Sequence, residues 1–88
     1  MDLKNAKVLV TGGSMGIGYA AAKVLIDAGA KVVICGRDAK RLETAGKELG
    51  ATPILADVAK EDDVINLVTK TIEALDGYNV LINNAAYG

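Results

Sequence analysis

Four short apolar runs divide the chain into nearly equal parts. They cover residues 8–10, 32–35, 54–56 and 80–82, and their starts lie 24, 22 and 26 residues apart. None of the runs alternates apolar with polar residues, and β-branched residues are frequent in them. Continuous runs of this kind are typical of strands that are covered on both faces, as in a parallel sheet. The spacing fits a strand plus a crossover helix, so we predict an α/β fold in one domain, residues 1–88.

The segments between the apolar runs carry helix signals. Gly29 and Gly77 are expected to end the first and last helices. The middle helix is expected at about residues 39–49, with Asp38 as its N-cap and Gly50 as its stop. Acidic residues at 61–63 are expected to form a solvated start of the last helix. The predicted core stripes are Ile17, Ala21, Val24, Leu25 and Ala28 in the first helix, and Val64, Leu67, Val68, Thr71, Ile72 and Leu75 in the last.

Right-handed crossovers arrange these elements in only a few ways. We predict a Rossmann-type doubly wound parallel sheet with strand order 3-2-1-4 and three crossover helices. The order reverses between the first and fourth strands, so a crevice is expected at their carboxyl ends.

A glycine-rich segment follows the first apolar run and precedes the first helix. Its sequence is Thr11-Gly12-Gly13-Ser14-Met15-Gly16-Ile17-Gly18. Glycine permits the tight turn, and it lets a ligand approach the backbone where unpaired helix N–H groups point outward. That position suits a pyrophosphate, while the last glycine allows close packing of helix and strand. The segment predicts a dinucleotide-binding turn, although an ordinary glycine-rich strand–helix turn is the other interpretation.

Composition excludes several other functions. The net charge is −1, which gives no electrostatic footprint for nucleic acid or for an anionic membrane. No apolar run approaches the length of about 18 residues that a membrane span needs. The chain has no histidine and one cysteine, Cys35, which we expect to be a small core residue at a strand end. We therefore expect a cytoplasmic protein without a metal site or a disulfide framework.

Four motifs together resemble the short-chain dehydrogenase/reductase family. They are Thr11-Gly12-x-x-x-Gly16-x-Gly18, Gly36-Arg37, Asp57-Val58 and Asn83-Asn84-Ala85, one after each predicted strand. The first spacing is that of the T-G-x-x-x-G-x-G branch, and the chain looks most like the 3-oxoacyl-carrier-protein reductases in it. The resemblance covers essentially all 88 residues and corresponds to the N-terminal part of a family member.

The resemblance implies a set of cofactor-binding residues. The glycine-rich turn would line the pyrophosphate, Arg37 would meet the adenosine ribose, and Asp57 would accept a hydrogen bond from the adenine amino group. The Val58 backbone would lie beside the adenine, and Asn84 with Ala85 along the ribose. The full set is Gly12, Ser14, Met15, Gly16, Ile17, Gly18, Arg37, Asp57, Val58, Asn84 and Ala85.

Charge after the second strand bears on the choice of cofactor. An acidic residue there would bind the 2′-hydroxyl of NAD and repel a 2′-phosphate. This chain has Gly36 and Arg37 instead, and a guanidinium suits a phosphate. We expect NADP(H) rather than NAD(H); the other interpretation of Arg37 is a solvated arginine at a helix start.

The resemblance places the catalytic Tyr-x-x-x-Lys pair and its serine beyond the fourth strand, so we expect no catalytic residue in these 88 residues. Tyr19 and Lys23 have that spacing, but they follow the glycine turn and are interpreted as surface residues. Two hypotheses remain. The chain is either the cofactor-binding part of an NADP-dependent oxidoreductase or a non-catalytic nucleotide-binding or sensor module. For the first, we expect a carbonyl or alcohol substrate, a separate C-terminal half and a homo-oligomer.

Overall fold

The computed structural model describes residue 4 and residues 6–12, 16–76 and 80–83, the last four by their backbone alone. Strands and helices alternate along this part of the chain, as predicted. The elements are β1 (Lys7–Thr11), α1 (Gly16–Asp27), β2 (Lys31–Gly36), α2 (Ala39–Leu49), β3 (Thr52–Leu55), α3 (Glu61–Leu75) and β4 (Val80–Asn83).

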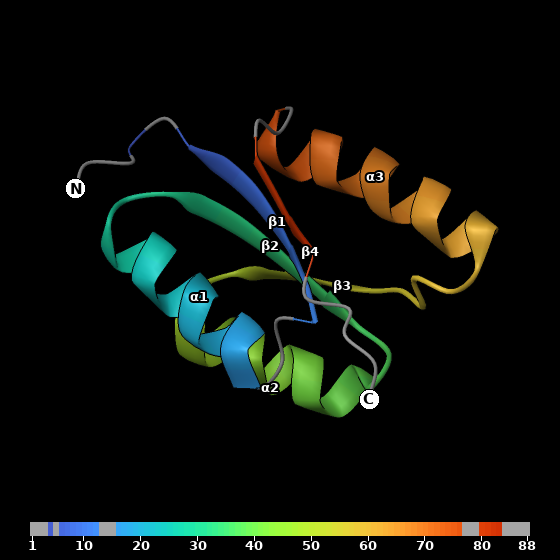
Figure 1. Ribbon diagram of the computed structural model, residues 1–88, viewed down its shortest axis with the longest axis horizontal. Helices are drawn as coiled ribbons and strands as arrows, with labels where there is room; N and C mark the ends of the chain where they lie inside the picture. Colours follow the sequence, from blue (N-terminus) through green and yellow to red (C-terminus); the bar gives the residue numbers. More distant parts are fainter. Residues whose placement is uncertain (1–3, 5, 13–15, 77–79, 84–88) are drawn as a thin grey trace.

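The described strands form one parallel sheet in the order β3-β2-β1-β4, which is the predicted order. Helices α1 and α2 cover one face and α3 covers the other, so the molecule has three layers (Figure 1). From β1 the chain moves outward through β2 to β3 and then returns to β4 on the opposite side of β1. The switch point of the sheet therefore lies between β1 and β4.

The two faces of the sheet carry separate core clusters. Val8, Val10, Val32 and Ile34 face one cluster, while the intervening strand residues face the other, because side chains alternate along a strand. Both faces are buried, which explains why the apolar runs do not alternate with polar residues. The first cluster includes Ala22, Leu42, Ala45 and Leu49 of α1 and α2, and the second is Leu9, Val33, Cys35, Ile54, Ala56, Leu67 and Leu75.

Cys35 is buried in the second cluster, as expected. Burial raises the pKa of its thiol above the ordinary value, and a hydrogen bond with the Gly12 backbone acts in the opposite direction.

The ends of α2 are as predicted. The Arg41 N–H donates to Asp38 Oδ1 at 3.1 Å, and Gly50 ends the helix with a left-handed φ of 76°. The predicted stop of α3 at Gly77 is wrong by one residue, because Asp76 already has a left-handed φ of 58°. Aspartate tolerates this conformation better than most residues. The Asp76 carbonyl also accepts a hydrogen bond from Lys7 Nζ at 2.9 Å, which ties the end of α3 to β1.

The predicted stripe of α1 is only partly correct. Ile17 and Val24 are 79% and 63% exposed, whereas the buried residues of this helix are Gly18 and Ala22. Small side chains at 18 and 22 let the helix lie close to the sheet, while Ile17 and Val24 point to solvent. Leu25, which belongs to the predicted stripe, is half-buried and packs against the first core cluster. The α3 stripe agrees better, with Leu67, Thr71 and Leu75 buried, but Ile72 is 46% exposed.

The third strand begins and ends earlier than its apolar run. It covers Thr52–Leu55, while Ala56 lies beyond its end and is still buried. Pro53 is tolerated because β3 has β2 as its neighbour and lies at an edge of the described sheet.

Candidate functional site

The carboxyl ends of the strands lie at one edge of the sheet. Thr11 pairs with Cys35 on one side and with Asn83 on the other. Two backbone hydrogen bonds continue the ladder past the strands, from the Gly12 N–H to the Cys35 carbonyl at 2.9 Å and from the Ala56 N–H to the Gly36 carbonyl at 3.0 Å. The segments that follow β1, β2 and β3 are therefore held side by side, and three of the four predicted motifs begin there.

The glycine turn has the backbone that only glycine adopts readily. Gly12 and Gly16 have φ values of 71° and 62°. Among the described residues, no atom lies within 4 Å of the point where a Cβ on Gly16 would stand. Gly18 is buried, which agrees with its predicted packing role. Among the described residues, the space above Gly16 at the start of α1 is therefore open.

The start of α1 is suited to an anion. Its first turn holds no acidic residue, whereas the first turn of α3 holds Glu61, Asp62 and Asp63. The first N–H groups of a helix have no partner within it, and the helix dipole favours negative charge at this end. A pyrophosphate fits this donor set and the open space above Gly16. Ile17 is exposed beside this helix start.

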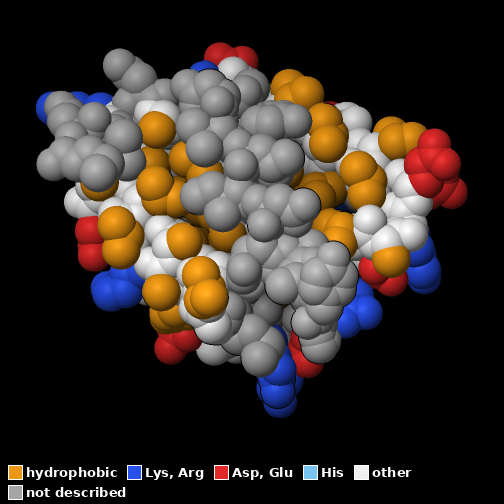
Figure 2. Space-filling view, viewed as in Figure 1, with side chains coloured by type: hydrophobic (Ala, Val, Ile, Leu, Met, Phe, Trp, Pro, Cys, Tyr) orange, Lys and Arg blue, Asp and Glu red, His pale blue; other side chains and the backbone are white. Residues whose placement is uncertain are grey.

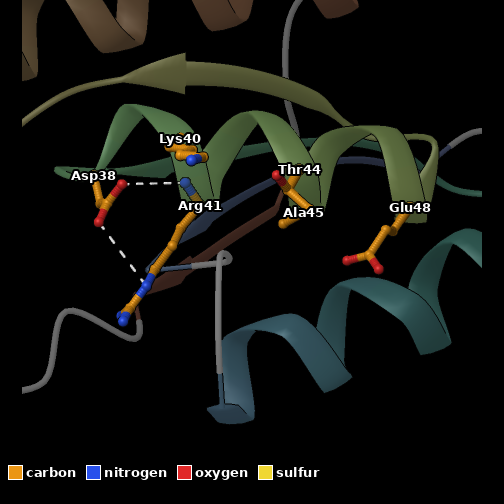
Figure 3. A pocket seen from close by; sticks show the side chains of 6 residues that line it. All are labelled: Asp38, Lys40, Arg41, Thr44, Ala45 and Glu48. Atoms are coloured by element: carbon orange, nitrogen blue, oxygen red, sulfur yellow. Dashed lines mark hydrogen bonds and ion pairs between the residues drawn. The ribbon is translucent and has the colours of Figure 1, made fainter.

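Arg37 is exposed directly after β2, and the first turn of α2 follows it. Next to it, Asp38 caps α2 and lies 3.9 Å from Arg41 Nε in an exposed ion pair. Asp38 and Arg41 border a hollow of about 500 Å³ on the side of α2 that faces α1 (Figure 3). Its lining residues are Asp38, Lys40, Arg41, Thr44, Ala45 and Glu48. The lining holds two acidic and two basic side chains, whose formal charges cancel. The exposed Arg37, which precedes Asp38 in the chain, adds a positive charge outside this lining.

The loop after β3 is held in place by hydrogen bonds from its backbone N–H groups to two aspartate side chains. Asp57 is half-buried, and its Oδ1 accepts a hydrogen bond from the Ala59 N–H at 3.0 Å. The Asp57 N–H donates to Asp63 Oδ2 at 2.8 Å. Val58 is exposed at the loop's surface. Because Ala56 is bonded to Gly36, Asp57 stands near the end of β2 that carries Arg37.

Four predicted site residues, Ser14, Met15, Asn84 and Ala85, lie outside the described residues. The structure therefore brings together Gly12, Gly16, Ile17, Gly18, Arg37, Asp57 and Val58 at one edge of the sheet. In the described part of the chain there is no group of three or more His, Cys, Asp or Glu side chains that could hold a metal ion. No helix in that part is long and apolar enough to cross a membrane.

Tyr19 and Lys23 do not form a pair. Tyr19 is half-buried against the first core cluster, rather than on the surface as predicted, and its hydroxyl donates to Glu48 Oε1 of α2 at 3.5 Å. Lys23 instead makes an exposed ion pair with Asp27 at 3.7 Å. The two side chains therefore contribute to the α1–α2 packing and to the surface.

The predicted solvated start of α3 is also only partly correct. Glu61 and Asp62 are exposed, but Asp63 is half-buried and bonded to the loop that carries Asp57. Sequence reasoning missed this residue because an acid in a first helical turn is ordinarily a solvated partner of the helix dipole.

A parallel, doubly wound sheet whose switch point lies between β1 and β4 defines the Rossmann class of fold. Comparison with known proteins gives the family. The pattern of the short chain dehydrogenase family matches residues 6–88, and the chain belongs to that family.

Individual relatives are also similar. The glucose 1-dehydrogenase of Gluconobacter oxydans is 44% identical over 87 residues, which cover 92% of this chain and 33% of that protein. An NADPH-bound short chain oxidoreductase from Pseudomonas aeruginosa PAO1, described as having an atypical catalytic centre, superposes with a TM-score of 0.94. It is 37% identical, with 99% of this chain and 37% of that chain covered. A putative β-ketoacyl-ACP reductase has a TM-score of 0.89 at 38% identity, with 98% and 35% covered. The chain spans about a third of the length of the curated relatives that it matches.

Proposed function

We propose that this chain is the NADP(H)-binding N-terminal portion of an oxidoreductase that transfers hydride between NADP(H) and a carbonyl or alcohol substrate. The family supports the oxidoreductase class, and the NADPH-bound relative supports the cofactor. The parent enzyme is further proposed to be a cytoplasmic homo-oligomer whose substrate-binding and catalytic residues belong to its C-terminal part.

One observation carries the choice of cofactor. The strand β2 ends at Gly36 without an acidic side chain, and the exposed Arg37 follows at the same edge as the glycine turn. A carboxylate after β2 would repel a 2′-phosphate, whereas a guanidinium presents a fork of donors to it. In this proposal the glycine turn and the N-terminus of α1 hold the pyrophosphate, Asp57 accepts from the adenine amino group, and Ser14, Met15, Val58, Asn84 and Ala85 line the rest of the cofactor.

Calorimetric titration of the chain with NADPH and NADH tests the proposal. We expect NADPH to bind at least about tenfold more tightly, because a charge-assisted contact contributes about 1.5–3 kcal/mol. Arg37→Ala should remove most of that difference and leave NADH affinity nearly unchanged. Lys47→Ala is the matched control, because Lys47 is a basic residue in the last turn of α2 and pairs with Glu43. Equal wild-type affinities for the two cofactors would contradict the choice of NADP(H).

The non-catalytic module is the second function that the sequence left open. It is distinguished by adding the C-terminal part of a relative, such as the Gluconobacter oxydans glucose 1-dehydrogenase, to the purified chain. Steady NADPH oxidation with a carbonyl substrate by the pair, but not by the chain alone, favours the enzyme. Oxidation by the chain alone that is lost on Tyr19→Phe would instead give Tyr19 a catalytic role.

A further inference from the structure

We propose that Asp63 is a positioning residue for adenine recognition, which acts by fixing the loop that carries Asp57. The inference rests on the proposed function, in which Asp57 accepts a hydrogen bond from the 6-amino group of adenine. Asp63 itself lies in the first turn of α3 and touches the loop, and it is given no contact with the cofactor.

Three hydrogen bonds define the loop. Asp63 Oδ2 accepts from the Asp57 N–H at 2.8 Å, Asp57 Oδ1 accepts from the Ala59 N–H at 3.0 Å, and the Asp57 carbonyl accepts from the Lys60 N–H at 2.9 Å. The first of these is charge-assisted, half-buried and the shortest, so it is the strongest restraint on the Asp57 backbone. The other two lie within the loop itself and would move with it.

The bond from Asp63 is not a helix cap. The N-cap residue of α3 is Lys60, which makes no side-chain hydrogen bond to the helix. An acid at the third helical position usually reaches back to the N-cap N–H. Here the Asp63 carboxylate reaches three residues further back along the chain, to Asp57. The neighbouring Glu61 and Asp62 are exposed and serve the helix dipole equally well. The stabilisation of the helix start therefore does not account for the placement of Asp63.

The arrangement leaves one Asp57 oxygen for a ligand. Oδ1 is held by the Ala59 N–H, and among the residues that the structure describes no donor reaches Oδ2. A carboxylate with one oxygen engaged and its backbone fixed on both sides has lost most of its freedom before any ligand binds. Such preorganisation lowers the entropy cost of a new contact, so Asp63 would increase the discrimination that Asp57 provides.

The test compares NADPH with its analogue that carries hypoxanthine in place of adenine. Hypoxanthine has a carbonyl oxygen where adenine has the 6-amino donor, so the hydrogen bond from that position to Asp57 is lost. We expect the wild-type chain to prefer NADPH by about tenfold, and Asp63→Ala to lose most of this preference. Asp63→Asn keeps an oxygen acceptor for the Asp57 N–H and should restore the preference. Asp62→Ala, which removes the adjacent exposed acid, is the matched control and should leave the preference unchanged.

A second measurement does not depend on the cofactor. Hydrogen exchange of the Asp57 amide should accelerate in Asp63→Ala and remain close to wild type in Asp63→Asn and Asp62→Ala. An unchanged preference for adenine in Asp63→Ala, or unchanged exchange at Asp57, would overturn the inference. Equal wild-type affinity for the two dinucleotides would overturn the proposed role of Asp57 itself, and with it the positioning role.

Discussion

Two glycines of this chain allow the binding role of the turn to be separated from its conformational role. Gly16 begins α1 with a φ of 62°, and Gly50 ends α2 with a φ of 76°. At both positions, no described atom lies within 4 Å of the place where a Cβ would stand. Substitution by alanine therefore costs stability through the left-handed backbone alone, about 1–2 kcal/mol at each position. For a domain of this size, that cost lowers Tm by about 4–16 °C.

The same substitutions should differ in their effect on the cofactor. Valine at 16 would project into the open space above α1 and resist the required φ because it is β-branched. We expect Gly16→Val to abolish NADPH binding and Gly16→Ala to weaken it. Gly50→Ala and Gly50→Val should retain wild-type affinity, because Gly50 lies at the far end of α2 from the glycine turn.

Thermal unfolding with and without NADPH, followed by circular dichroism, measures both effects at once. A ligand at about 100 times its Kd stabilises the folded state by about 2.7 kcal/mol, which raises Tm by about 10 °C or more. The Gly50 variants should show this rise from a lowered starting Tm, and Gly16→Val should show none. A folded Gly16→Val variant with the full NADPH-dependent rise would refute the reasoning, and the turn would then be structural only.

Two further predictions concern the chain without a ligand. Burial raises the pKa of the Cys35 thiol in the folded state above its ordinary 9.0. The neutral buried thiol therefore contributes fully to the free energy of unfolding below pH 9, and this contribution is lost as the pH rises through the folded pKa. Urea unfolding of the wild-type chain should show a steeper loss of stability at alkaline pH than unfolding of Cys35→Ala. In the described sheet, β4 has only β1 beside it, and apolar side chains are exposed over α1 and α3 (Figure 2). We therefore expect light scattering to show that the chain self-associates. The double variant Ile65→Asp, Ile72→Asp should reduce the self-association. A stable wild-type monomer with a sharp thermal transition would contradict the second prediction.

Much of the fold could be predicted from local patterns in the sequence. The runs at β1 and β2 are apolar at every central position, and a strand needs that pattern only when both faces are covered. Asp38 and Gly50 mark the ends of α2 because each supplies a specific hydrogen bond or backbone conformation. Asp76 was missed since the next residue, Gly77, is the usual choice for the same left-handed position.

The candidate site was predictable to the extent that its residues follow strands. Gly12, Arg37 and Asp57 each come directly after a strand or one residue beyond it, so a parallel sheet brings them to one edge whatever the details of packing. Asp63 belongs to a helix, and its contact depends on how the loop after β3 turns back over α3. A separation of six residues between Asp57 and Asp63 does not predict a contact, because the contact depends on the conformation of that loop.

The exposed residues of α1 show what helical periodicity leaves undecided. Ile17 and Val24 are seven residues apart and so lie on one side of the helix. Tyr19 is two residues from Ile17, about 200° around the helix, and it contacts Glu48 of α2. Ile17 and Val24 therefore lie on the flank away from α2, and the buried side of the helix is made by the small residues Gly18 and Ala22. A hydrophobic pattern favours the positions with the largest side chains, whereas the sheet contact here requires the smallest. Close packing at Gly18 and Ala22 thus leaves Ile17 and Val24 exposed, although the helical pattern predicts both in the core.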